Sequence, residues 1–129
     1  MSENLEIMIV DDENQITDLL KSFISLHAPD AIVHAFNDPG EAMSYLQSNH
    51  LDLVITDYQM PCINGLTLLE SAHPDVTKVL ISGYVSQIAE EKLSKLNAVF
   101  FEKPIKFLEL GKIIDNCQKN TAELRNDFH

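Results

Sequence analysis

Five short apolar runs recur along the chain, and after each of them apolar residues return every three or four positions. Short apolar runs predict β-strands, and a period near 3.6 residues predicts amphipathic helices. The third run, residues 51–57, is the most continuous and is rich in β-branched residues, which is typical of a strand buried on both faces. Such a strand normally ends in a turn, but this one ends in a carboxylate, Asp57.

The predicted elements alternate along the whole chain. Strands are expected over residues 5–10, 31–36, 51–57, 77–81 and 98–101. Helices are expected over about 11–27, 38–48, 66–72, 85–96 and 110–117. The acidic residues 11–13 would then lie in the first turn of the first helix, where the helix dipole favours negative charge. The polar segment 121–129 is expected to fray, so we assign residues 1–120 to one domain and 121–129 to a polar C-terminal tail.

Two local signals define the shorter helices. Asp38 and Pro39 indicate a helix start, because aspartate is a favoured N-cap and proline is tolerated in the first turn. Pro74 ends the third helix and leaves it only about two turns, since proline cannot continue the pattern of backbone hydrogen bonds.

Strand and helix alternate five times without a repeated motif, a low-complexity segment or a linker. This alternation predicts an α/β domain with a doubly wound, five-stranded parallel sheet, helices on both faces and right-handed crossovers. We adopt the strand order 2-1-3-4-5 from known sheets of this kind rather than derive it. A chain of 129 residues that is 45% apolar is long enough to bury one such core.

Charge and cysteine content narrow the possible classes of function. The formal net charge is −11 and only 9 residues are Lys or Arg, so direct nucleic-acid binding by this domain is not expected. Acidic surfaces suit cations or basic protein partners instead. Cys62 and Cys117 form no disulfide framework, which favours a reducing cytoplasm. Without a signal peptide or an apolar run of membrane-spanning length, a soluble cytoplasmic protein with no membrane contact is expected.

Polar residues follow the predicted strands, at the sheet edge where ligands of open α/β folds collect. They are Asp11 and Asp12 after the first strand, Asp57 after the third, Ser82 after the fourth and Lys103 after the fifth. In the adopted order these positions converge on one rim. Three neighbouring carboxylates repel one another unless a cation lies among them, and Mg²⁺ prefers such oxygen ligands. A hydroxyl and an ammonium group beside them suit an anion, which indicates a phosphoryl group.

Asp57 stands in the position of a nucleophile. A strand-end aspartate that attacks phosphorus would form an aspartyl phosphate. This transfer needs little beyond alignment and neutralisation of charge, and a metal ion, Ser82 and Lys103 would supply both.

The chain resembles the receiver domains of two-component response regulators over roughly residues 5–119. Five motifs carry the resemblance, and they are Val10–Glu13, Thr56–Pro61, Asn64–Gly65, Ser82–Tyr84 and Lys103–Pro104. Each motif is weak alone, but all five follow one another in the right order and at the right strand ends. The resemblance implies the flavodoxin-like receiver fold and a phosphorelay switch rather than an ordinary turnover enzyme.

The resemblance also implies roles for the acidic site. Asp57 would accept a phosphoryl group from a sensor histidine kinase or a phosphotransfer protein. Asp12 and Asp57 would bind Mg²⁺ directly, Asp11 would do so chiefly through water, and Gln59 would contribute its backbone carbonyl. The phosphorylated domain would then control a downstream protein partner or an output domain.

On the same resemblance, Ser82 would contact a phosphoryl oxygen and Lys103 would pair with the phosphoryl charge. Phe100 stands at the aromatic switch position, three residues before the lysine. Movement of Ser82 toward the phosphoryl group would let Phe100 turn inward and reshape the face made by the fourth helix, fifth strand and fifth helix. A homodimer through this face is a further expectation. Tyr84 is assigned either to limiting the access of water or to packing.

Three features depart from the usual family pattern. Cys62 stands where receivers usually have glycine, which affects the mobility of the loop after Asp57. The interval from Asp57 to Ser82 is short by about one helical turn, so a truncated third helix is expected. The switch residue is Phe100 rather than tyrosine and therefore has no phenolic hydroxyl. The peptide bond before Pro104 is expected to be cis, as in receivers generally.

Other interpretations stay open at this stage. Each motif alone has a structural explanation, such as acids at a helix start for Asp11 and Asp12. A phosphatase of the haloacid dehalogenase type also uses a strand-end aspartate with Mg²⁺, but has a second aspartate where this chain has Gln59. A pseudo-receiver that binds partners without phosphorylation usually lacks an acidic or lysine residue of the site. Nucleotide binding is disfavoured, because neither a Walker A loop nor a G-x-G-x-x-G motif occurs.

The remaining candidates are weaker. Histidines at positions 27, 34, 50, 73 and 129 lack the spacing of metal ligands, so we interpret them as structural or exposed. Phe107, Leu108 and Leu110 cannot all face the core from one helix, which predicts an exposed apolar strip. Whether the receiver acts alone or is joined to an output domain stays open.

Overall fold

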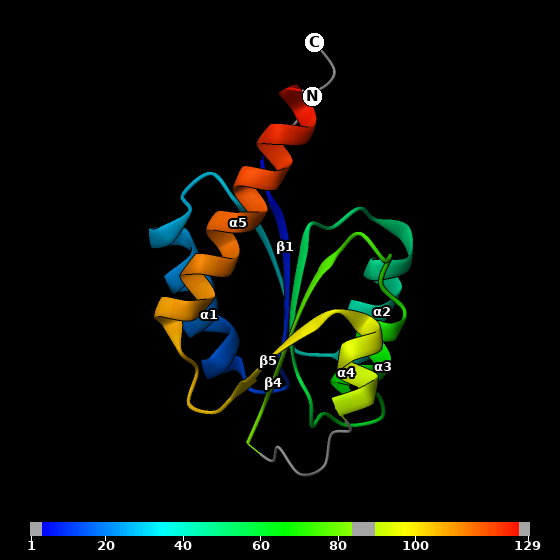
Figure 1. Ribbon diagram of the computed structural model, residues 1–129. Coiled ribbons are helices and arrows are strands. Elements are labelled where there is room, and N and C mark those ends of the chain that lie inside the picture. The colour runs from blue at the N-terminus through cyan, green and yellow to red at the C-terminus, as the bar shows by residue number, and fades with distance from the viewer. Residues whose placement is uncertain (1–3, 84–89, 127–129) are drawn as a thin grey trace.

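Strands and helices alternate strictly in the computed structural model, which describes residues 4–83 and 90–126 (Figure 1). The strands are β1 (Glu6–Val10), β2 (Ile32–Phe36), β3 (Leu53–Asp57), β4 (Thr77–Ser82) and β5 (Ala98–Glu102). The helices are α1 (Asn14–His27), α2 (Pro39–Ser48), α3 (Gly65–Glu70), α4 (Glu90–Leu96) and α5 (Phe107–Asn126). Each predicted strand is present, with ends that differ by at most two residues from the prediction.

All five strands are parallel and form one sheet in the order β2-β1-β3-β4-β5. The predicted doubly wound α/β fold and its strand order are therefore confirmed. β3 lies at the centre of the sheet, hydrogen-bonded to β1 and β4, and all five of its residues are buried. Asp57 is the last residue of this central strand.

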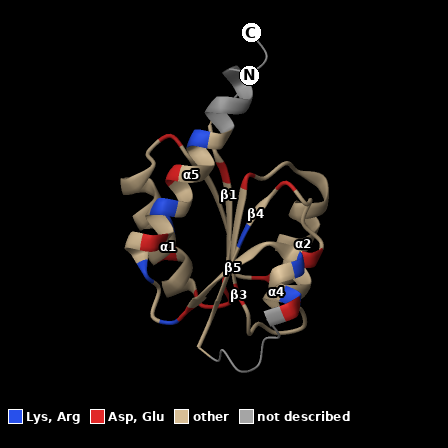
Figure 2. Cartoon of the chain, viewed as in Figure 1, with Lys and Arg blue, Asp and Glu red and all other residues tan. Residues whose placement is uncertain are grey.

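Helices cover both faces of the sheet, with α1 and α5 on one side and α2, α3 and α4 on the other (Figure 1). Successive strand residues point to opposite faces. β3 accordingly gives Leu53 and Ile55 to the core under α1 and α5, and Val54 to the core on the other side. Basic positions are spread along α4 and α5 (Figure 2). Within the described residues, no helix is long and apolar enough to cross a membrane.

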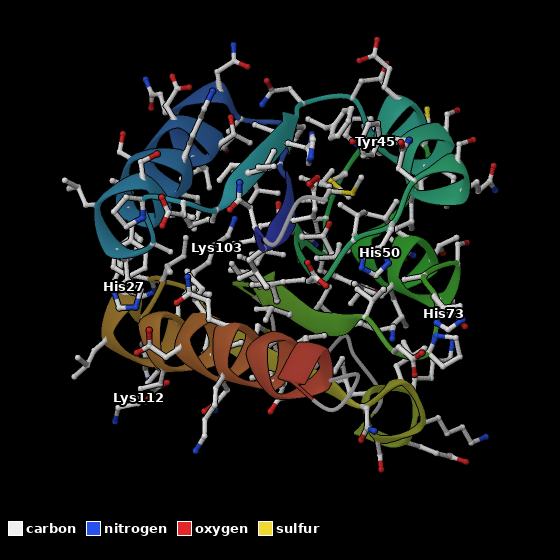
Figure 3. The ribbon with its side chains drawn as sticks, turned by 90° about the horizontal axis from the view of Figure 1, so that it is seen from above. His27, Tyr45, His50, His73, Lys103 and Lys112 are labelled. Carbon is white, nitrogen blue, oxygen red and sulfur yellow. The ribbon has the colours of Figure 1, made fainter. Side chains whose placement is uncertain are left out.

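An imidazole joins α1 to α5. Nε2 of His27 lies 3.1 Å from the carbonyl oxygen of Gly111 and 2.9 Å from Oδ1 of Asp115 (Figure 3). Since both neighbours are acceptors, this nitrogen carries the proton. A Cβ at position 111 would lie 2.9 Å from the imidazole, so glycine leaves the room that the histidine occupies. The Phe23 ring stacks on His27 and also contacts Phe107.

Two helix predictions were wrong at their ends. α1 begins at Asn14, so no acidic residue lies in its first turn, because Asp11 accepts a hydrogen bond from the N–H of Glu13 and holds the preceding turn. α5 is longer than the predicted 110–117, since it runs from Phe107 to Asn126, and the fraying expected beyond residue 121 stays a prediction. The division into a domain of 1–120 and a tail stays a prediction.

Three further predictions have different outcomes: one is confirmed, one is wrong and one lies partly outside the described residues. The truncated third helix is confirmed, since α3 has only 6 residues. The apolar strip at the start of α5 is wrong, because Leu110 is buried and Phe107 packs against the core, which leaves Leu108 exposed. The expected beginning of the fourth helix, residues 85–89, lies outside the described part of the chain, and α4 is seen from Glu90.

Candidate functional site at the carboxyl edge of the sheet

Three carboxylates meet where β1 and β3 leave the sheet. One oxygen from each of Asp11, Asp12 and Asp57 lies within 4.8 Å of the others. Asp11 and Asp57 are only 2% and 7% exposed, whereas Asp12 is open to solvent. In the described part of the chain, this is the only such group of His, Cys, Asp or Glu that could hold a metal ion. The three acids expected at one rim are thus brought together.

Lys103 reaches this group from the loop after β5. Its Nζ lies 3.3 Å from Oδ1 of Asp57, and the same oxygen accepts a hydrogen bond from the N–H of Tyr58 at 3.0 Å. The peptide bond between Lys103 and Pro104 is cis, as predicted. One carboxylate oxygen of Asp57 is therefore held by two donors, while Asp11 and Asp12, which follow β1, lie nearby.

Burial controls the protonation of the acids. It raises the pKa of Asp57, and the Lys103 ammonium opposes that rise. Burial also raises the pKa of Asp11 to about 6, with the carboxylates of Asp57 and Asp12 adding to the rise and the Glu13 N–H opposing it. The cluster holds more negative charge than one ammonium group neutralises, so a divalent cation with oxygen ligands fits its chemistry.

The turn after β3 folds back over Asp57 because position 65 is glycine. A Cβ there would overlap the carbonyl oxygen of Asp57, and the N–H of Gly65 donates to the carbonyl of Tyr58 at 2.8 Å. Asn64 caps α3 by accepting a hydrogen bond from the N–H of Thr67. The predicted Asn64–Gly65 motif is thus the device that brings the chain back against the end of β3.

Cys62 adopts a left-handed backbone conformation, with φ of 69°. Residues other than glycine occupy this region only at a cost, which accounts for the glycine expected at this position of the loop. The thiol is exposed. The substitution therefore places mild backbone strain in the loop that follows Asp57.

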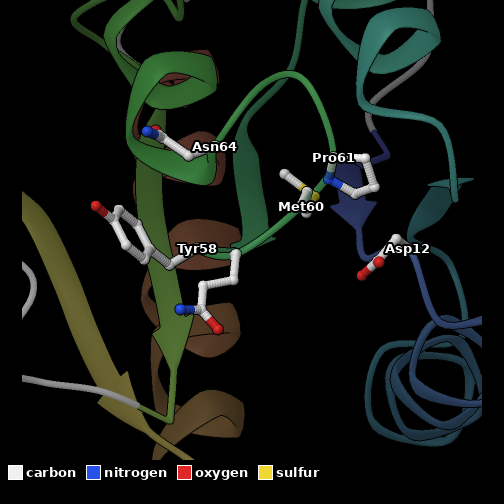
Figure 4. A pocket seen from close by; sticks show the side chains of 6 residues that line it. Asp12, Tyr58, Met60, Pro61 and Asn64 are labelled. Carbon is white, nitrogen blue, oxygen red and sulfur yellow. The ribbon is translucent and has the colours of Figure 1, made fainter.

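An open hollow of about 460 Å³ adjoins the acidic cluster (Figure 4). It is lined by Asp12, Tyr58, Gln59, Met60, Pro61 and Asn64. Its walls come from the end of β1 and from the loop after β3. Gln59, predicted to offer its carbonyl to a metal ion, therefore lines the same hollow as Asp12.

Ser82 and Phe100 lie on the two neighbouring strands. Ser82 is fully buried at the end of β4, and its carbonyl accepts a hydrogen bond from the N–H of Lys103 at 2.9 Å. Phe100 is half-buried on β5, opposite Leu80 of β4. Tyr84 lies outside the described residues.

A model of the response regulator receiver domain matches residues 7–115. The chain belongs to the response regulator receiver family. The resemblance inferred from five motifs is therefore confirmed, and it covers nearly all of the described sheet.

Two curated response regulators illustrate the relationship of this receiver. RpfG of Xanthomonas campestris, a cyclic di-GMP phosphodiesterase response regulator, is 30% identical over 112 residues, which are 82% of this chain and 30% of that protein. The putative two-component response regulator ARR21 of Arabidopsis thaliana is 34% identical over 120 residues, which are 90% of this chain and 19% of that protein. The receiver thus spans less than a third of either relative.

Solved structures agree on the fold of the receiver. A CheY-like receiver domain from Methanospirillum hungatei has a TM-score of 0.78 at 24% identity, covering 93% of this chain and 98% of that one. The N-terminal domain of an uncharacterized protein from Wolinella succinogenes has a TM-score of 0.80 at 26% identity, covering 92% of this chain and 98% of that one.

Sequence reasoning missed one residue that supports the receiver site. The side-chain amide of Asn37, just after β2, donates to the carbonyl of Asp11 at 2.8 Å and to Oγ1 of Thr17 at 3.0 Å. It ties the acidic turn to β2 and to α1. Its place directly after the second strand was the one available signal.

Proposed function

We propose that this receiver accepts a phosphoryl group on Asp57 in a Mg²⁺-dependent reaction and acts as a switch. The observation that carries the proposal is the position of Asp57. It ends the central strand, 3.3 Å from the Lys103 ammonium and beside two further carboxylates. The donor would be the phosphohistidine of a sensor histidine kinase or a phosphotransfer protein, and the proposal includes a cytoplasmic location.

The two carboxylate oxygens of Asp57 would have different roles in the transfer. Oδ1 already accepts hydrogen bonds from Tyr58 and Lys103, so Oδ2 is the oxygen proposed to attack phosphorus. A P–O bond forms as the P–N bond of the donor breaks. Lys103 would then pair with a phosphoryl oxygen and stabilise the added negative charge.

The acidic cluster is the proposed binding place of Mg²⁺. Asp12 and Asp57 would hold the ion directly, Asp11 through water and Gln59 through its carbonyl. When bound, the ion neutralises charge on the group in transfer. The fit rests on three carboxylates within 4.8 Å of one another, a density of charge that a hard divalent cation suits.

Switching would start at Ser82 and pass to Phe100. The Ser82 hydroxyl would donate to a phosphoryl oxygen, and Phe100 would turn inward and reshape the α4–β5–α5 face. A backbone hydrogen bond between Lys103 and Ser82 already couples the ends of the two strands. A downstream partner or output domain would respond to that face. A homodimer through it, and the role of Tyr84, stay predictions.

Intact mass after incubation with acetyl phosphate tests the proposal. The wild type should gain one phosphoryl group only when Mg²⁺ is present, and Asp57→Asn should gain none. Asp52→Asn is the matched control, because Asp52 directly precedes β3, at the opposite end of this strand from Asp57. Consumption of the donor without an adduct would indicate a phosphatase. If acetyl phosphate is not consumed and no adduct forms, the result would indicate a pseudo-receiver or a strict need for the cognate kinase.

A further inference from the structure

The turn that carries Asp11 and Asp12 is tied to the second strand by hydrogen bonds on both sides of Asp11. The N–H of Asp11 donates to the carbonyl of Phe36, the last residue of β2, at 3.1 Å. The residue after that strand, Asn37, donates from its side-chain amide to the carbonyl of Asp11 at 2.8 Å. The same nitrogen donates to Oγ1 of Thr17 on α1 at 3.0 Å. One side chain thus joins β2, the acidic turn and the first helix.

The position of Asp12 depends on its backbone. Asp12 is exposed, and no residue that the structure describes forms a hydrogen bond or an ion pair with its carboxylate. Figure 4 shows this side chain directed toward the hollow beside the phosphorylation site. The carbonyl of Asp11 belongs to the planar peptide unit that leads into Asp12, so a bond that holds this oxygen also sets the direction in which Asp12 begins. Asn37 therefore influences where the Asp12 carboxylate lies relative to Asp57.

We propose that Asn37 is a positioning residue for Mg²⁺ binding, because its amide holds the acidic turn where Asp12 and Asp57 can ligate one ion. The proposal rests on the Mg²⁺ site of the proposed function and adds to it a residue that does not touch the ion. The carboxylates of the cluster lie within 4.8 Å of one another and repel. Without the tether, the exposed acid would move away from the buried pair. Binding would then have to reassemble the site, which weakens the apparent affinity.

Thr17 fixes the Asn37 amide from the other side. It is buried, and its hydroxyl donates to the carbonyl of Asn14 at 3.0 Å, so the oxygen that accepts from Asn37 is itself held. A water molecule that replaced the amide would satisfy the Asp11 carbonyl without joining it to β2 or α1. Substitution of Asn37 therefore removes a tether, and not only a hydrogen bond.

Titration of the metal-free, isotope-labelled full chain with Mg²⁺, followed by amide NMR, tests the proposal. Asn37→Ala should raise the Kd for Mg²⁺ about tenfold, as loss of an outer partner of a metal ligand does. Asn49→Ala is the matched control, because the Asn49 amide also donates to a backbone carbonyl, that of Tyr45 at 3.0 Å, where α2 ends. The control should bind Mg²⁺ like the wild type. An Asn37→Ala variant with the wild-type Kd would overturn the proposal.

The rate of phosphorylation by acetyl phosphate separates positioning from a general loss of structure. Asn37→Ala should need correspondingly more Mg²⁺ for its half-maximal rate and approach the wild-type rate when Mg²⁺ saturates, because the bound ion restores the position of Asp12. A lower maximal rate with an unchanged Mg²⁺ requirement would mean that Asn37 only supports the structure, and would overturn its assigned role.

The two levels of the argument fail in different ways. A wild type whose amide signals do not respond to Mg²⁺ would overturn the proposed metal site and, with it, the role of Asn37. Wild-type binding that Asn37→Ala leaves unchanged would overturn the role of Asn37 alone.

Discussion

Carboxylates at the two ends of the parallel strands, the carboxyl edge and the amino edge of the sheet, have opposite surroundings. At the carboxyl edge, Asp11, Asp12 and Asp57 face one another, and Lys103 is the cation beside them. The acids there are crowded, and burial raises the pKa of two of them. Their charges are compensated only in part by the described residues around them.

At the amino edge, Asp52 and Glu6 each have partners of their own. Oδ2 of Asp52 accepts the N–H of Glu6 at 2.8 Å, and its Oδ1 lies 3.1 Å from Nε2 of His50. The Glu6 carboxylate lies 2.8 Å from Nε2 of His34, which the Tyr45 hydroxyl also contacts. Figure 3 views the sheet from this edge.

Two lysines, Lys78 near the amino edge and Lys103 at the carboxyl edge, differ in the same way. Lys78 is buried, and its ammonium donates to the carbonyls of His73 and Val76 at 3.1 and 2.9 Å. Its ammonium contacts local backbone groups, whereas that of Lys103 contacts Asp57, the proposed phosphoacceptor. Residue type alone therefore does not indicate function in this fold. An incompletely balanced charge at the edge where ligands collect does.

The largest expected effect comes from the backbone of the carboxyl edge. Gly65→Ala should lower the free energy of unfolding by about 3 kcal/mol, because the added Cβ overlaps the Asp57 carbonyl and the turn must shift. Urea denaturation measures the change. Gly83→Ala is the control, since a Cβ there meets no atom of the described residues within 4 Å. Similar losses for both variants would contradict the close approach at Gly65.

Asp11→Asn should stabilise the metal-free protein near neutral pH. Burial raises the pKa of Asp11 from 3.8 to about 6, which corresponds to an upper limit of roughly 3 kcal/mol. Because the folded state holds this proton more tightly, wild-type stability should rise as pH falls from about 6 toward 3.8. The variant should lack that rise.

Urea denaturation with a chelator, on both sides of pH 6, measures this difference between wild type and Asp11→Asn. Saturating Mg²⁺ should reduce the advantage of the variant, because a ligand that binds the folded wild type stabilises it. A variant less stable than wild type near neutral pH would mean that Asp11 is not under electrostatic strain.

The same substitution at the amino edge should have the opposite sign. Asp52→Asn should lower the free energy of unfolding by about 1 kcal/mol, because a carboxamide replaces a carboxylate that accepts from both Glu6 and His50. Thermal or urea denaturation beside Asp11→Asn gives the comparison directly. Changes of the same sign in both variants would break the distinction between the two edges.

The smallest expected effect concerns the loop after Asp57. Cys62→Gly should raise the free energy of unfolding by about 0.5 kcal/mol, since relief of the left-handed conformation slightly exceeds the entropy that glycine adds to the unfolded chain. Cys62→Ala keeps the side-chain constraint and is the control. A loss of stability in Cys62→Gly would show that the thiol makes a favourable contact.

The sequence was sufficient to predict the strands and the parallel sheet, because buried runs mark strands and alternation with helices marks parallel pairing. The meeting of the acids also depended on the strand order, which was adopted from known sheets of this kind. Contacts between side chains could not be predicted from the sequence. The position of Asn37 under Asp11 depends on the register of β2 against β1, and no local pattern encodes that register. The start of α1 was misplaced because a buried acid that organises a turn resembles one in a helix.

The histidines show the same limit. Their spacing gave no sign of partners, yet each of the four in the described residues lies beside a carboxylate. The pairs are His27 with Asp115, His34 with Glu6, His50 with Asp52 and His73 with Asp75. Two of them join elements that are far apart in the chain, so only the tertiary fold brings them together.

The contact of His27 with Gly111 has a consequence for how this sequence can diverge. The imidazole fills the space that a side chain at position 111 would need. A side chain there would displace the imidazole from the Gly111 carbonyl and from Asp115, although the two positions are 84 residues apart in the chain. Descendants that lose this glycine should therefore also lose the contact between the imidazole and Asp115.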